Sequence, residues 1–92
     1  MARVVVTLRI MPQSPEVNLS DLESKAKQEI VNFCNSEEFK VEMQPIAFGL
    51  KALMILFVME ESIGTTEKLE QKISQIEGVE SVEVTDVRRA VG

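Results

Sequence analysis

The sequence contains no histidine, tryptophan or tyrosine, and a single cysteine among its 92 residues. Without histidine, the commonest general base and metal ligand is missing. The one thiol, Cys34, excludes an intramolecular disulfide and any site built from several cysteines. The four glycines form neither a Walker-type loop nor a Gly-x-Gly-x-x-Gly turn. Glu60 and Glu61 could ligate a cation, but a solvated strand end is the simpler interpretation. We therefore expect no covalent catalysis, no cofactor and no metal.

Positive charge and long apolar runs are also scarce. The net charge of −5 argues against binding to a phosphate backbone, which needs clustered Lys and Arg; Arg88-Arg89 is the one adjacent basic pair. No segment approaches the roughly 20 apolar residues of a membrane span. Arg3 and Arg9 interrupt the N-terminal apolar run where a signal peptide would need it unbroken. We expect a cytoplasmic protein that contacts no membrane and binds no nucleic acid directly.

The apolar residues in the first half predict a strand and a helix. Period-2 alternation predicts a strand over about residues 2 to 11, ended by Pro12. Either Asn18 or Ser20 then begins a helix, and Ser20 forms a capping-box spacing with Glu23. Apolar residues that recur every three or four positions give this helix one stripe: Leu19, Leu22, Ala26, Ile30 and Phe33.

The second half of the chain predicts two strands, a helix and a last strand. A half-buried strand carries Phe39, Val41 and Met43 on one side and is followed by a turn at Phe48-Gly49. The next strand is apolar on both faces, with Leu53, Ile55, Phe57 and Met59 on one and Ala52, Met54, Leu56 and Val58 on the other. Thr65 or Thr66 caps a helix with apolar Leu69, Ile73 and Ile76, Gly78 closes it, and Val82 and Val84 point inward from the last strand.

This order of elements predicts an α+β fold of the ferredoxin-like type. A βαββαβ chain with right-handed crossovers forms a sandwich of a four-stranded antiparallel sheet with two helices on one face. The first and third strands are then central, and the uncovered face leaves Met54, Leu56 and Val58 partly exposed. We expect one domain over residues 1–92.

Three features are candidates for a functional surface: Phe48 at the turn, Lys51 just after it, and the Arg88-Arg89 pair. Spacing alone favours a Phe48 ring that packs on its own strands, and solvated charges at the other positions. The turn and the end of the last strand need not lie far apart in this fold, although strand parity does not fix the rim of each. An aromatic side chain at a turn and a basic C-terminal pair on a rigid sheet suit protein binding better than catalysis.

The segments QPIAFGLKALMILFVMEE (44–61) and VESVEVTDVRRAVG (79–92) resemble the guanine-nucleotide exchange domain of translation elongation factor one-beta, most closely its short archaeal form. The resemblance covers essentially the whole chain, and P-I-x-F-G-L-K-x-L is quite specific to that family. It implies a factor that binds the GTPase elongation factor one-alpha and speeds the release of GDP. It further implies that Phe48, before Gly49, occupies a pocket on the GTPase. Arg89 takes the place of the basic residue that disturbs the magnesium and phosphate site.

The C-terminus departs from the eukaryotic pattern. Those members place a lysine one residue from the chain end, whereas here Arg89 is followed by Ala90, Val91 and Gly92. Arginine is planar and forked rather than a point charge. Whether Arg88, Arg89 or neither reaches the nucleotide site therefore stays open.

Two other classes of function share this order of elements. RNA-recognition domains need aromatics on the open faces of the first and third strands, where the first strand has none and the third has Phe57. A small-molecule regulatory domain would bind its ligand at a dimer interface through Met54, Leu56 and Val58. Nucleotide exchange needs only a monomer.

Overall fold

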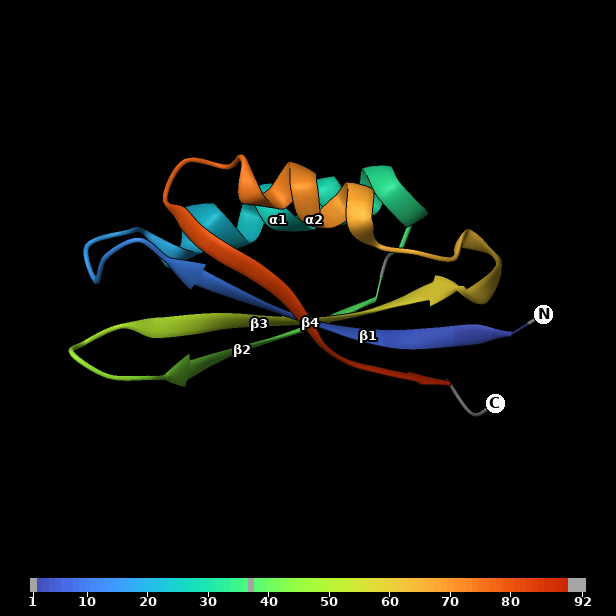
Figure 1. Ribbon diagram of the computed structural model, residues 1–92, viewed down its shortest axis with the longest axis horizontal. Helices are drawn as coiled ribbons and strands as arrows, with labels where there is room; N and C mark the ends of the chain where they lie inside the picture. The colour runs from blue at the N-terminus through green and yellow to red at the C-terminus, as the bar shows by residue number, and fades with distance from the viewer. Residues whose placement is uncertain (1, 37, 90–92) are drawn as a thin grey trace.

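The computed structural model describes residues 2–36 and 38–89; residues 1, 37 and 90–92 lie outside the described part. The elements are β1 (Arg3–Pro12), α1 (Leu19–Cys34), β2 (Phe39–Pro45), β3 (Lys51–Glu60), the short 3-10 turn η1 (Glu61–Ile63), α2 (Glu67–Ser74) and β4 (Val79–Arg89). The strands form one antiparallel sheet in the order β2-β3-β1-β4, and both helices cover the same face of it (Figure 1). The predicted ferredoxin-like α+β fold is confirmed, with β1 and β3 central.

The core lies between the helices and the two central strands. Every second residue of β1 and β3 is buried on this side, and their registers match: Val6 lies opposite Phe57 and Leu8 opposite Ile55. The helices contribute Leu22, Ala26, Ile30, Leu69 and Ile73, all almost fully buried. The apolar faces predicted from periodicity therefore pack together as expected, because one face of the sheet and two amphipathic helices bury each other's apolar sides.

No helix of residues 2–36 and 38–89 lies over the opposite face of the sheet. Met54, Leu56 and Val58 are half-buried there, as predicted for this face, because neighbouring side chains cover them only in part. Phe57 and its cross-strand partner Phe39 both lie on the helix side. Among the described residues, the open face of the sheet therefore presents no aromatic ring on which a nucleic-acid base could stack.

The first helix is capped at its N-terminus by Asn18 rather than by Ser20, the other possible cap. The Asn18 side-chain oxygen accepts hydrogen bonds from the backbone N–H groups of Ser20 and Asp21 at 3.0 and 3.2 Å. These N–H groups would otherwise have no partner in the first turn. The helix ends where Asn35 adopts a left-handed conformation with φ of 56°.

The second helix is shorter than its apolar spacing suggests. It ends at Ser74, so the prediction that Gly78 closes it is wrong. Gly78 instead sits before β4 with φ of +96°, and a Cβ there would lie 3.1 Å from a methyl group of Val17. Its carbonyl accepts a hydrogen bond from the Gln13 N–H at 2.8 Å. The glycine is needed for a close approach between two loops rather than for a helix cap.

The last strand contains a bulge. Leu8 lies opposite Val84 while Thr7 lies opposite Asp86, which leaves Thr85 as an extra residue in β4. Before the bulge, Val82 and Val84 face the helices, as predicted. After it, Val87 and Arg89 lie opposite Val6 and Val4 and therefore share the helix side of the sheet.

Candidate partner-binding site

The turn between β2 and β3 holds Phe48 in an unusual backbone conformation. The Leu50 N–H donates to the Ala47 carbonyl at 2.9 Å and closes a β-turn. Its two central residues, Phe48 and Gly49, have φ of 54° and 78°. Positive φ at both positions is the requirement of a type I′ turn, which normally selects Asn and Gly. Gly49 fits this requirement, and Phe48 does not.

The Phe48 ring gains nothing from this position within its own chain. Its exposed fraction is 95%, the largest among the exposed large hydrophobic residues of the described chain. A bulky side chain at positive φ costs about 1–2 kcal/mol relative to the ordinary right-handed region. Burial on its own strands, which spacing alone favours, is therefore not what the fold does. The expectation that Phe48 stays outside is confirmed, and strain of this kind typically gathers at functional positions.

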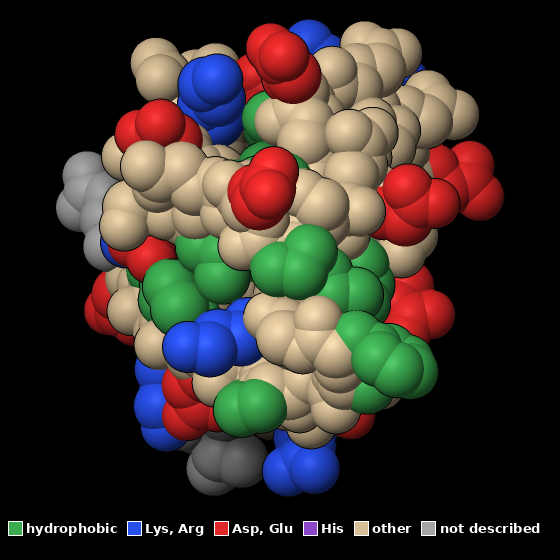
Figure 2. Space-filling model, turned by 90° about the vertical axis from the view of Figure 1, so that its left-hand side faces the viewer, with side chains coloured by type: hydrophobic (Ala, Val, Ile, Leu, Met, Phe, Trp, Pro, Cys, Tyr) green, Lys and Arg blue, Asp and Glu red, His purple; other side chains and the backbone are tan. Residues whose placement is uncertain are grey.

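Apolar side chains surround the turn at this end of the molecule. Met43 and Ile46 are 44% and 39% exposed, and Gly49 lies close to Pro15, whose side chain would be 3.9 Å from an added Cβ. A groove of about 300 Å³ runs beside them, lined in part by Pro15, Met43 and Lys51. Figure 2 views this end and shows hydrophobic side chains gathered with a few basic and acidic ones between them.

Met43 and Ile46 were not singled out from the sequence. The alternation of β2 placed Met43 on the covered side of a half-buried strand, but the sheet extends past the end of the helix layer here, so Met43 stays 44% exposed. An apolar residue directly after Pro45, at the tip of an edge hairpin, was the signal available for Ile46. Lys51 is exposed at the start of β3, as a solvated turn lysine would be.

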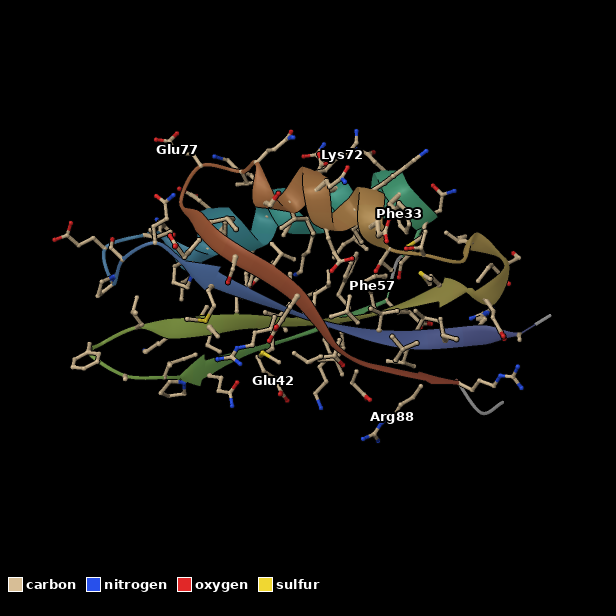
Figure 3. The ribbon with its side chains drawn as sticks, viewed as in Figure 1. Phe33, Glu42, Phe57, Lys72, Glu77 and Arg88 are labelled. Carbon is tan, nitrogen blue, oxygen red and sulfur yellow. The ribbon has the colours of Figure 1, made fainter. Side chains whose placement is uncertain are left out.

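The two arginines of the basic pair point to opposite faces of the sheet. Arg88 lies opposite Val5 on the open face, where Figure 3 shows it below the sheet, and Arg89 lies opposite Val4 on the helix side. Each arginine forms an ion pair with a different carboxylate. Arg88 Nε lies 2.7 Å from an Asp86 oxygen, and Arg89 Nη2 lies 3.1 Å from Glu61 Oε1.

The turn and the arginines lie at opposite ends of the molecule. Because β3 and β4 both pair antiparallel with β1, they run in the same direction, and Arg89 reaches the residue that follows β3. The turn precedes β3, whose length of ten residues corresponds to about 30 Å. Figure 1 shows the turn at the left end and the described end of β4 at the right. The structure thus brings Phe48, Gly49 and Lys51 together, and separately Arg88 and Arg89.

The described residues offer little for chemistry. No group of three or more Cys, Asp or Glu side chains in ranges 2–36 and 38–89 is placed to hold a metal ion. Burial raises the pKa of the Cys34 thiol, with a backbone hydrogen bond involving Ser36 acting in the opposite direction, so the reactive thiolate is disfavoured at neutral pH. No helix in this part of the chain is long and apolar enough to cross a bilayer. The Phe48 turn and the two arginines are exposed and so accessible to another protein.

Comparison with known proteins identifies the family. Residues 5–90 match the model for the EF-1 guanine nucleotide exchange domain, so the chain belongs to that family. It is 44% identical over 89 residues to elongation factor 1-beta of Methanothermobacter thermautotrophicus, covering 97% of this chain and 98% of the relative. The corresponding protein of Hyperthermus butylicus is 43% identical over 90 residues, covering 97% and 96%.

A solved structure supports the architecture independently. The de novo designed protein Foldit4 matches with a TM-score of 0.63 over 98% of both chains at 23% identity. At this level of identity the match concerns the fold alone. The matched family range, 5–90, includes both the Phe48 turn and the two arginines, and the family supports an EF-1 exchange role.

Proposed function

We propose that this protein promotes GDP release and GTP loading on the GTPase elongation factor one-alpha, without covalent chemistry. Support comes from the exchange-domain family and from relatives named elongation factor 1-beta. The observation that carries the proposal is Phe48, held 95% exposed in a strained turn. The proposed acting unit is a single domain and a monomer in the cytoplasm, where elongation takes place.

The proposed mechanism uses the two ends of the sheet for different tasks. Phe48 enters a pocket on the GTPase and supplies binding free energy, as a buried aromatic does at an interface hot spot. A guanidinium from the other end approaches the magnesium and phosphate groups, where it competes electrostatically with the metal. GDP binding weakens because magnesium and the phosphates supply much of its affinity.

The separation of the two ends sets a condition on the partner. The GTPase must present a pocket and a nucleotide site about 30 Å apart, the distance that β3 spans. A thousandfold weakening of GDP binding requires about 4 kcal/mol of coupling, at roughly 1.4 kcal/mol per tenfold. Linkage is reciprocal, so this protein then binds the nucleotide-free GTPase more tightly than the GDP-bound form by the same factor.

The test is release of a fluorescent GDP analogue from archaeal elongation factor one-alpha, with and without this protein. Release that accelerates with concentration and saturates is expected for the wild type. Phe48→Ala abolishes the stimulation while the fold stays intact, because the ring makes almost no contact within the chain. Val31→Ala, which removes another exposed apolar side chain (38%) from α1, is the matched control and keeps full activity.

Two results would count against the proposal. Absence of acceleration with an active cognate GTPase removes the exchange function and brings forward a ferredoxin-like small-molecule-binding regulatory domain. For that class, the hollow of about 280 Å³ on the open face, lined in part by Val5, Leu56 and Val58, is the place to look. Normal exchange by Phe48→Ala leaves the function in place but removes the role given to the ring.

A further inference from the structure

Arg89 is not free to act in the structure, because Glu61 already holds it. Its Nη2 donates to Glu61 Oε1 at 3.1 Å, and this contact joins the end of β4 to the residue after β3. The two side chains remain 75% and 44% exposed, so a partner can reach both. Any phosphate that binds Arg89 therefore brings a second anion against the Glu61 carboxylate, and the repulsion between the two favours departure of Glu61.

Glu61 is a fixed point, whereas Arg89 is a long side chain on an exposed strand end. The Glu61 N–H donates to the Ala2 carbonyl at 3.0 Å, and the Glu61 carbonyl accepts from the Gly64 N–H at 3.1 Å. Its backbone is thus tied both to the start of β1 and across the η1 turn. A carboxylate on an anchored backbone restricts the guanidinium to one location beside it.

The bulge in β4 makes this contact possible. If β4 alternated regularly through Thr85 with no bulge, Arg89 would lie on the open face of the sheet. The bulge reverses the alternation, so Arg89 lies on the helix side, where the chain leaving β3 brings Glu61. Arg88 takes the open face and pairs instead with Asp86 of its own strand, at 2.7 Å.

We propose that Glu61 is a positioning residue that restrains Arg89 in the free protein, and that Arg89 must leave Glu61 to act at the magnesium and phosphate site of the GTPase. This inference rests on the function proposed above. The exchange of partners conserves charge pairing, since the guanidinium leaves one anionic oxygen for another. The Glu61 contact lowers the free energy of the unbound state and so opposes engagement.

The expected effect is modest and has a defined sign. Glu61→Gln keeps the size and backbone contacts but removes the charge, so Arg89 is released and the half-saturating concentration for exchange falls. Exposed ion pairs of this kind correspond to about a two- to fivefold change. The gain is expected near 0.01 M salt and fades toward 0.5 M, because the Debye length falls from about 30 Å to a few ångströms.

Asp86→Asn is the matched control. It removes an equally exposed carboxylate from the other arginine, on the opposite face of the same strand. No gain is expected, because the proposed action belongs to Arg89 and not to Arg88. A double variant, Glu61→Gln with Arg89→Ala, is expected to behave as Arg89→Ala alone, since without the guanidinium there is nothing to release.

A readout without the GTPase tests the restraint itself. NMR of the Arg89 Nε–H in the free protein is expected to show slowed guanidinium motion in the wild type and faster motion in Glu61→Gln. If the wild type exchanges nucleotide but Glu61→Gln is unchanged or slower, the restraint is overturned and the exchange function stands. The restraint is likewise overturned if Asp86→Asn gives an equal gain, or if the gain survives in the Arg89→Ala background. A wild type that does not accelerate release overturns both proposals.

Discussion

Replacing Phe48 with asparagine separates the stability of the turn from its function. The ring is 95% exposed, so its removal forfeits about a twentieth of the 1.5–3 kcal/mol that burial of such a side chain contributes, or about 0.1 kcal/mol. The φ of 54° costs a bulky residue about 1–2 kcal/mol, and asparagine relieves part of it because its short polar side chain tolerates this region. We expect Phe48→Asn to raise the free energy of unfolding by about 0.5–1 kcal/mol.

Urea and thermal unfolding measure this gain. For a domain of this size, it corresponds to a rise in Tm of about 2–8 °C. Phe48→Ala serves as the comparison, because alanine keeps a Cβ at positive φ and leaves stability within about 0.5 kcal/mol of the wild type. Stimulated GDP release is expected to be lost in both. If both variants are destabilised by more than about 1 kcal/mol, the ring packs on the chain in solution and the reasoning from strain is refuted.

Two further substitutions test the turn at the site and the N-terminal cap of α1. Gly49→Ala is expected to lower the free energy of unfolding by about 1 kcal/mol in urea titration, because a φ of 78° strains any residue with a Cβ. A clash is not the cause, since the nearest Pro15 atoms would lie 3.9 Å from the added Cβ. An unchanged midpoint would contradict the assigned turn. Asn18→Ala is expected to lower the free energy of unfolding by about 1 kcal/mol, because α1 loses its cap. If Ser20→Ala has this effect and Asn18→Ala does not, the cap is at Ser20.

The fold was predictable because its signals are local and repeated. Alternation in β1 and β3 and the stripe through Leu22, Ala26 and Ile30 each specify an element and the side it buries. With the order of elements known, few arrangements satisfy short, right-handed connections. The end of α2 was misplaced because Ile76, outside the helix, still packs on the core and extends the apparent period.

The site was predictable in its residues but not in its geometry. Phe48 and the arginines stand out in the sequence, yet the register that separates the turn from the strand end is a property of the assembled sheet. The bulge at Thr85 has no local signature, and it alone decides that Arg88 and Arg89 exchange faces. The contact between Arg89 and Glu61 depends on that bulge. Regular alternation in β4 would have placed Arg89 on the other face of the sheet, so the sequence pattern could not predict this pair.

The separation of anchor and cation suits the task of an exchange factor. If the guanidinium lay next to Phe48, both side chains would contact the same area of the GTPase. The contacts that hold the complex together would then also control how the guanidinium approaches the nucleotide. Here β3, whose helix side is buried from Leu53 to Met59, joins the two ends as a stiff element that resists bending. In the mechanism proposed above, affinity contributed by Phe48 holds Arg89 at a fixed distance, near the nucleotide site. In the free protein Glu61 holds the guanidinium beside the end of β3, and in the mechanism proposed above this contact breaks before Arg89 engages the nucleotide site.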